Sequence, residues 1–334
     1  MLQPLPSPVS GGDVVVDVHL DEDPERTRRE IREDLLRPRR QIAPRFFYDD
    51  RGCELFEAIT ALPEYYQTRT ERALLEQVAA DVARRTVCRA LVELGSGAST
   101  KTRVLLDAML PRGGCELYVP FDVNAAVVRR AGEELVAAYP GLHVHGIIGE
   151  FSRHLDAIPP AAGRLLIFLG GTIGNFTPGA ARRFLAHLAG VMQPGEHFLL
   201  GVDLIKDISR LEAAYNDARG VTAEFNRNIL RAVNAAANAD FDPAAFEHRA
   251  FYDRANHWIE MRLVARRDHE VHLRAAGLLL LLRRGDEIRT EISVKYDRSM
   301  VHDLLAAAGF EPIAWYTDPD ALFGLALARR NASR

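Results

Sequence analysis

The chain has 334 residues, 48% of them hydrophobic and 26% charged, a composition that predicts a globular protein with a sizeable core and excludes long disordered stretches. Its 42 Lys and Arg against 46 Asp and Glu give a formal net charge of −4. This balance gives no sign of a nucleic-acid or membrane partner, since both normally need a concentrated basic surface. The length suits two domains, or one domain with a large insertion.

From the N-terminus, residues 1–22 are expected to form a tail. Asp23 is expected to cap a helix that carries Pro24 in its first turn and ends before Pro38. An aromatic patch follows at 46–48 and 65–66. Aromatic residues this dense near turns indicate either core packing or the lining of a ligand pocket.

The three cysteines are Cys53, Cys88 and Cys115. Because they are odd in number and widely spaced, they form neither a zinc pattern nor a disulfide framework, and we expect a cytoplasmic protein without a metal. No apolar run is long enough to span a membrane, and the N-terminus lacks the basic and apolar regions of a signal peptide.

A turn with two glycines, Gly95-Ser96-Gly97, separates an apolar strand over 89–94 from a helix over 100–109. Glycine adopts backbone conformations forbidden to other residues, and its missing side chain lets a ligand lie against the chain, with the helix N-terminus facing an anionic group. The motif alone is weak evidence, because an ordinary tight strand-to-helix turn can have the same pattern.

The next predicted strand ends in Asp122, 27 positions after Gly95, where a doubly wound fold places the carboxylate that binds ribose hydroxyls. Dinucleotide folds add a third glycine, which lets the helix pack closely below a pyrophosphate, and Thr100 stands there instead. The sequence therefore favours S-adenosylmethionine over NAD.

Strand and helix patterns alternate from 89 to 204, which predicts a Rossmann-like α/β fold with one parallel sheet and ligand-binding loops at the carboxyl ends of its strands. One such loop, 170–176, holds three glycines and Asn175. Such a loop can approach a ligand and offer amide donors, although Asn175 is equally consistent with a purely local turn.

The alternation stops after Asp207, where helices over 209–219 and 222–237 and strands over 258–265, 270–273 and 288–296 indicate an α+β insertion of about 90 residues. We expect the first domain to comprise 72–206 and 298–334. A second, discontinuous domain would comprise 23–71 and 207–297.

In the last strand of the insertion, alternation places Glu291 and Ser293 on one face and apolar residues on the other. These two side chains are consistent with a recognition surface, but the pattern alone favours a solvated face. Tyr215 and Met261 lie at helix and strand positions typical of core residues.

Five motifs together resemble one family. They are Phe47-Tyr48-Asp49-Asp50-Arg51-Gly52, Leu62 to Glu71, Val92 to Gly97, Phe168 to Asn175, and Phe225-Asn226-Arg227-Asn228. The chain from Pro44 onward resembles the L-histidine Nα-methyltransferases of ergothioneine biosynthesis (the EgtD family). The resemblance implies an enzyme that uses S-adenosylmethionine to trimethylate the α-amino group of L-histidine, giving hercynine and S-adenosylhomocysteine, with a class I methyltransferase domain and a histidine-binding domain.

The resemblance also implies roles for individual residues. Around the methyl donor it places Tyr48, Gly95, Lys101, Asp122, Glu150 and Phe151. Around the imidazole it places Tyr65, Glu291 and Ser293, with Met261 packed on the ring. At the substrate carboxylate and amine it places Asn175 and Tyr215, near the catalytic-centre residues Tyr48, Gly170 and Thr172. Two positions depart from the family pattern, Gly171 for Ser and Glu150 for Asp.

Three other readings stay open from the sequence. The first is a methyltransferase of the same fold acting on another amino acid or biogenic amine. The second is a non-catalytic protein that binds S-adenosylmethionine, and the third is an NAD-dependent oxidoreductase. We expect L-histidine as the small-molecule partner and a monomer.

Overall fold

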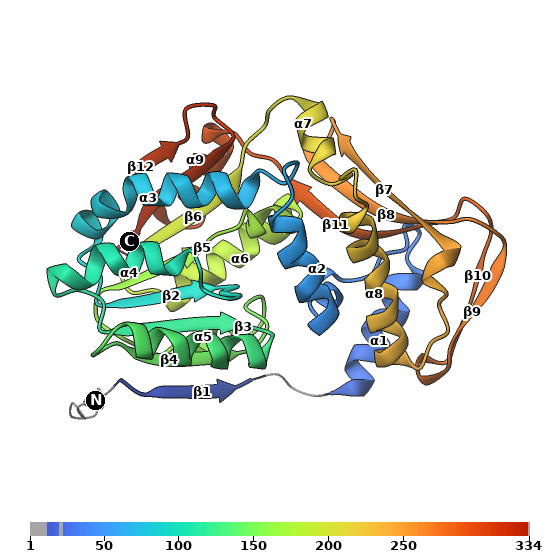
Figure 1. The fold of residues 1–334 in the computed structure, drawn as a ribbon, viewed down its shortest axis with the longest axis horizontal. Coiled ribbons are helices and arrows are strands. Elements are labelled where there is room, and N and C mark those ends of the chain that lie inside the picture. The colour runs from blue at the N-terminus through green and yellow to red at the C-terminus, as the bar shows by residue number, and fades with distance from the viewer. Residues whose placement is uncertain (1–11, 20–22, 333–334) are drawn as a thin grey trace.

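The protein is described from a computed structural model, which covers residues 12–19 and 23–332. Figure 1 shows a large sheet with helices on both faces and, beside it, a smaller body of helices and antiparallel strands. The strands of the large sheet lie in the order β1-β4-β3-β2-β5-β6-β13-β12. They are β1 (Val14–Val18), β2 (Ala90–Leu94), β3 (Leu117–Asp122), β4 (His143–Ile148), β5 (Arg164–Phe168), β6 (His197–Asp203), β12 (Phe310–Thr317) and β13 (Phe323–Arg330).

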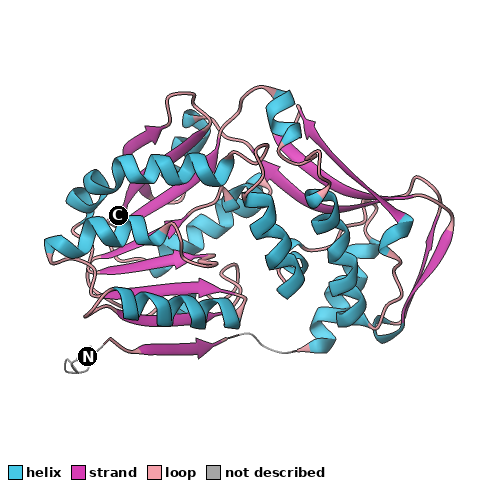
Figure 2. Ribbon diagram, viewed as in Figure 1, coloured by secondary structure: helices cyan, strands magenta, loops and turns pink. Residues whose placement is uncertain are grey.

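The six strands from β1 to β6 are parallel, whereas β13 runs antiparallel to β6 and β12 antiparallel to β13. Helices cover both faces of this sheet (Figure 2). Those on one face are α3 (Gln67–Thr86), α4 (Thr102–Met109) and α5 (Ala125–Ala138), and those on the other are α6 (Pro178–Val191) and α9 (Arg298–Ala307). Alternation along β2 explains the two layers. Leu91 packs in the apolar cluster under α3, α4 and α5, and its neighbour Val92 packs in the apolar cluster under α6 and α9.

The smaller body is built on a three-stranded antiparallel sheet in the order β11-β8-β7. Its strands are β7 (Phe246–Asp253), β8 (Trp258–Ala265) and β11 (Glu287–Val294), and the hairpin of β9 (His269–Leu273) and β10 (Leu278–Leu282) extends it. Its helices are α1 (Pro24–Leu36), α2 (Asp50–Thr60), α7 (Ile208–Ala213) and α8 (Val221–Ala237). A third apolar cluster joins the N-terminal helices to α8 and these strands, and the rings of Phe47 and Phe225 stack 4.5 Å apart within it.

Short 3₁₀ segments complete the fold, and two of them carry candidate residues. η1 (Pro44–Phe47) leads into Tyr48, and η4 (Thr172–Asn175) follows β5. The others are η2 (Leu110–Arg112), η3 (Leu155–Ala157), η5 (Pro243–Ala245) and η6 (Arg274–Ala276).

The sequence-based reading was wrong about part of the N-terminus. Residues 14–18, expected within a tail, form β1 at the edge of the sheet, with Val14 paired to Val144 of β4. A short strand of this kind depends on its neighbour for its hydrogen bonds, so its local pattern is weak. Residues 1–11 and 20–22 lie outside the described part of the chain. Within the described residues, no helix is long and apolar enough to cross a membrane.

Candidate active site

The glycine turn after β2 and the acid that ends β3 lie side by side, as predicted. Gly95 and Gly97 have positive φ angles of 71° and 49°. The Gly97 N–H donates to Asp122 Oδ2 at 2.9 Å, and the Asn124 N–H donates to Asp122 Oδ1 at 3.2 Å. Burial raises the pKa of Asp122, although these backbone hydrogen bonds oppose the shift. A Cβ at Gly97 would meet no atom within 4 Å, so the turn leaves open space for a ligand beside the carboxylate.

The loop after β4 covers this turn. The Phe151 ring lies 3.7 Å from where a Cβ of Gly95 would stand, and it packs edge-on against Phe168 with ring centroids 5.2 Å apart. The preceding Glu150 carboxylate lies 3.6 Å from the Arg45 guanidinium. The loop therefore presents an aromatic ring and an acid next to the glycine turn.

Lys101 and Gly170 meet through an acid that we did not predict. Glu71 of α3 is fully buried, pairs with the Lys101 ammonium, and accepts the Gly170 N–H at 2.8 Å. It therefore fixes the start of the loop after β5 against the segment that leads into α4. An acid among the buried positions of a helix was the available signal, but the sequence did not identify its partners.

The loop after β5 packs against the smaller body. A Cβ at Gly174 would stand only 2.8 Å from the Val294 carbonyl oxygen and 3.5 Å from Ser293 Oγ, so the loop contacts β11 directly. The Thr172 hydroxyl donates to the Leu169 carbonyl at 2.8 Å, a local bond. The half-buried Asn175 amide has no hydrogen-bond partner among the described residues, which leaves its donors and acceptor for a ligand.

Glu291 and Ser293 lie on the face of β11 that looks into the smaller body. Glu291 is paired with Met261 of β8, and Ser293 with Ile259. The Tyr215 hydroxyl donates to Ser293 Oγ at 2.9 Å, and the Tyr65 ring lies 6.5 Å from the Tyr215 ring. The reading of this face as solvated is wrong for Ser293, which is only 6% exposed, whereas Glu291 is half-buried.

Burial raises the pKa of Glu291 to about 7, and the Lys295 charge opposes this shift. The Glu291 carboxyl makes no hydrogen bond within the described residues. Burial also raises the pKa of Tyr48, Tyr65 and Tyr215, and the Glu291 charge adds to the shift in each case. The Asp122 charge raises the pKa of Tyr48 as well, so this tyrosine is within electrostatic range of both acids.

An ionic cluster that we did not predict supports this face. Asp203, at the end of β6, accepts hydrogen bonds from the Tyr66 hydroxyl at 2.9 Å, from Lys206, and from Lys295 at 2.8 Å. Burial alone would raise the pKa of Asp203, but the Lys295 and Lys206 charges hold it below the usual value. These positions are separated by up to 229 residues, from Tyr66 to Lys295, so the sequence alone gives no signal for the contact.

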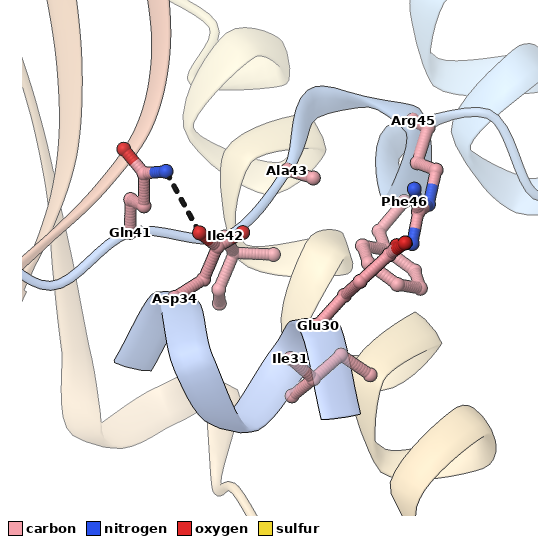
Figure 3. Close-up of a pocket in the computed structure, with 8 residues that line it drawn as sticks. All are labelled: Glu30, Ile31, Asp34, Gln41, Ile42, Ala43, Arg45 and Phe46. Carbon is pink, nitrogen blue, oxygen red and sulfur yellow. Dashed lines mark hydrogen bonds and ion pairs between the residues drawn. The ribbon is translucent and has the colours of Figure 1, made fainter. Parts of the chain in front are cut away.

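A separate small pocket lies between α1 and residues 41–46 (Figure 3). It measures about 10 Å³, room for about one water molecule. It is lined by Glu30, Ile31, Asp34, Gln41, Ile42, Ala43, Arg45 and Phe46. None of the predicted site residues is among these, so this pocket is not the candidate site.

The doubly wound sheet, the open glycine turn and the acid beside it define the class of protein, an S-adenosylmethionine-dependent methyltransferase of α/β fold. Residues 27–330 match the model of the family described as histidine-specific methyltransferase, SAM-dependent. The chain belongs to this family, and it is an enzyme that methylates histidine with S-adenosylmethionine as the methyl donor.

Curated relatives agree with this assignment. A histidine N-alpha-methyltransferase of Mycobacterium tuberculosis is 46% identical over 91% of this chain and 94% of that protein. Another, of Mycolicibacterium smegmatis, is also 46% identical, over 92% of this chain and 95% of that protein. Ergothioneine biosynthesis protein 1 of Neurospora crassa is 30% identical over 85% of this chain, which matches 33% of the longer fungal protein.

Proposed function

We propose that the enzyme transfers three methyl groups to the α-amino nitrogen of L-histidine, forming hercynine for ergothioneine biosynthesis. The observation that carries this proposal is the pair of Glu291 and Ser293, which offers a carboxyl group without a partner next to a buried hydroxyl. An imidazole ring, with an N–H donor and a bare nitrogen at fixed angles, complements this pair. The family match and the relatives at 46% identity support the same substrate.

The roles of the other residues follow from the resemblance to the family. Asp122 would bind the ribose hydroxyls, and the segments that flank it would hold the rest of the donor through Gly95, Lys101, Glu150 and Phe151. In the smaller body, Tyr65 would contact the imidazole and Met261 would pack on its face. Asn175 would bind the carboxylate and orient the amine. Tyr215 would face the amine with its hydroxyl oxygen as an acceptor, because its one proton goes to Ser293. Tyr48, Gly170 and Thr172 would surround the reacting nitrogen.

When bound, S-adenosylmethionine supplies a methyl group on a positively charged sulfur. The task of the protein is alignment, because the amine lone pair must point at the methyl carbon opposite the C–S bond that breaks. The Asn175 side-chain oxygen can accept an N–H of the neutral amine and turn the lone pair toward the donor. The tyrosines stay protonated, since burial raises their pKa, and so act as hydrogen-bonding groups.

We also propose that the chain is a monomer in the cytoplasm, with two domains divided close to the bounds that the sequence suggested. The first boundary moves from 71 to about 66, because α3 begins at Gln67 and packs on the large sheet. The three cysteines are all free, which fits a reducing compartment. The apolar cluster that joins the N-terminal helices to the insertion supports the domain division. Size-exclusion chromatography with light scattering tests the oligomeric state.

Mass spectrometry of a reaction with L-histidine and excess S-adenosylmethionine tests the proposed reaction. We expect mono-, di- and trimethylated histidine in sequence, with all three methyl groups on the α-nitrogen in the final product. A product that stays monomethylated at long times, or one methylated on the ring, would overturn the proposal.

A further inference from the structure

Lys295, the first residue after β11, is a buried cation on the same side of the strand as Ser293. Its side chain is 0% exposed. The Lys295 ammonium donates to Ser293 Oγ at 2.7 Å and to the Tyr215 hydroxyl at 3.1 Å, and it pairs with Asp203 at 2.8 Å. An ammonium group has three N–H donors and no acceptor, so these three contacts use it completely.

These contacts decide how the Ser293 hydroxyl is used. A hydroxyl oxygen has two lone pairs and one proton. One Ser293 lone pair accepts from Lys295, and the other accepts from the Tyr215 hydroxyl at 2.9 Å. The reverse direction, from Ser293 to Tyr215, is less favourable, because the phenol is the more acidic hydroxyl and therefore the better donor. Ser293 is therefore left with its proton alone.

We propose that Lys295 is a positioning residue that sets substrate specificity by making Ser293 an obligate hydrogen-bond donor. Ser293 then requires a ring atom with a free lone pair, while Glu291 accepts a ring N–H. The site selects a ring that offers one N–H and one bare nitrogen, which is the neutral imidazole. This inference rests on the proposed function, because it takes the Glu291 and Ser293 pair to be the ring site.

The chain contains a matched control in Lys206. Its ammonium contacts the same Asp203 and donates to the Tyr66 hydroxyl at 2.7 Å, and its side chain is only 7% exposed. No hydrogen bond joins Lys206 to Ser293 or Tyr215 within the described residues. Removing either lysine thus takes one cation from Asp203, but only the loss of Lys295 frees a Ser293 lone pair.

Isothermal titration calorimetry on the full chain, with S-adenosylhomocysteine present, tests the inference. The ligands are histidine and the two pyrrolylalanines, in which a C–H replaces one or the other ring nitrogen. In the wild type, we expect the better pyrrolylalanine to bind at least about tenfold more weakly than histidine, because the Ser293 proton finds no acceptor. In Lys295→Met this ratio should fall below about threefold, because Ser293 can turn its proton to Tyr215. Lys206→Met should keep the wild-type ratio.

Each result supports or overturns a specific statement. If Lys295→Met keeps the wild-type ratio of pyrrolylalanine to histidine affinity, or if Lys206→Met loses the discrimination equally, the role of Lys295 is overturned and the proposed function is not affected. A wild type that does not bind histidine overturns the proposed function, and this inference with it. If thermal unfolding shows that Lys295→Met does not fold, Lys295→Met/Asp203→Asn is compared with Lys206→Met/Asp203→Asn. Each double variant removes one ammonium together with the Asp203 carboxylate, so that the substitution itself leaves no unpaired carboxylate.

Discussion

Glu291 combines two properties that are unfavourable for stability and useful for binding. It is half-buried opposite Met261 of β8, and its carboxyl group makes no hydrogen bond within the described residues. A buried polar group without a partner costs about 1–3 kcal/mol. A substrate that supplies the missing donor recovers this cost, whereas an analogue without the donor does not.

Replacing Glu291 by alanine should therefore reduce selectivity for histidine. We expect Glu291→Ala to lose at least about tenfold in kcat/KM for histidine, equivalent to about 1.4 kcal/mol, and much less for phenylalanine or tryptophan if these react. Glu287→Ala is the control, since Glu287 lies on the same strand but pairs with Arg249 and Arg262. An unchanged histidine preference in Glu291→Ala would place imidazole recognition elsewhere.

The raised pKa of Glu291 also predicts how stability depends on pH. Because the pKa is about 7 in the folded state and the ordinary value is 4.5, the folded state binds this proton more tightly. The stabilisation is complete below about pH 4.5 and is lost as the pH rises through about 7. We expect Glu291→Gln to raise the free energy of unfolding by about 1–3 kcal/mol at pH 8 and to change it little at pH 4.5. Urea titrations of the ligand-free protein at both pH values measure this, and an equal effect at the two would contradict the assigned pKa.

At the scale of elements, the contact between η4 and β11 sets the geometry between the two bodies. η4 belongs to the large sheet's loops, and β11 belongs to the antiparallel sheet. The contact is close because Gly174 has no side chain, so the backbone of one element lies directly on the backbone of the other. This packing fixes the position of the residue that follows Gly174, which is Asn175.

A methyl group at Gly174 should separate the two elements. In Gly174→Ala, the new Cβ would stand 2.8 Å from the Val294 carbonyl oxygen, so the loop must move and carry Asn175 with it. We expect kcat/KM for histidine to fall by about tenfold or more, because small misplacements of aligning groups are costly. Gly190→Ala in α6 is the control, since its Cβ would meet nothing within 4 Å. It should stabilise the protein by about 0.5–1 kcal/mol and leave activity unchanged. Equal activity of the two variants would show that the contact does not position Asn175.

At the scale of the whole molecule, the Asp203 cluster joins the two bodies electrostatically. Asp203 ends β6 of the large sheet, Lys295 follows β11 of the smaller one, and Tyr66 precedes α3. All three are buried, so each depends on the others for its hydrogen bonds. Loss of the Asp203 carboxylate would leave the ammonium groups of Lys295 and Lys206 in the interior without their shared negative partner.

Asp203→Ala should therefore destabilise the entire fold. Breaking a buried ion pair by removing one partner costs about 3–5 kcal/mol, and here the carboxylate serves both Lys295 and Lys206. The comparison is Asp207→Ala, which removes an exposed helix cap and should cost about 1 kcal/mol. Urea denaturation gives both free energies of unfolding. A similar small loss in the two variants would mean that the cluster adds little to stability.

The sequence by itself determined the features that depend on local pattern. Apolar strands alternating with amphipathic helices predicted the doubly wound sheet, and the glycine turn and Asp122 were predicted to meet because parallel strands end at the same edge. Alternation along β11 placed Glu291 and Ser293 on one face, and the structure confirms that arrangement. Each of these inferences needs only residues close together in the chain.

The tertiary structure alone decided the rest. It gave Lys295 and Asp203 their partners, joined Glu71 to Gly170, packed Gly174 on β11, and placed β1 beside β4. The solvated and buried readings of Glu291 have the same sequence pattern, and only the elements packed over β11 distinguish them. The physical reason is that the burial and the hydrogen-bond partners of a charged or polar side chain depend on its neighbours in space. Here those neighbours come from segments far apart in the chain.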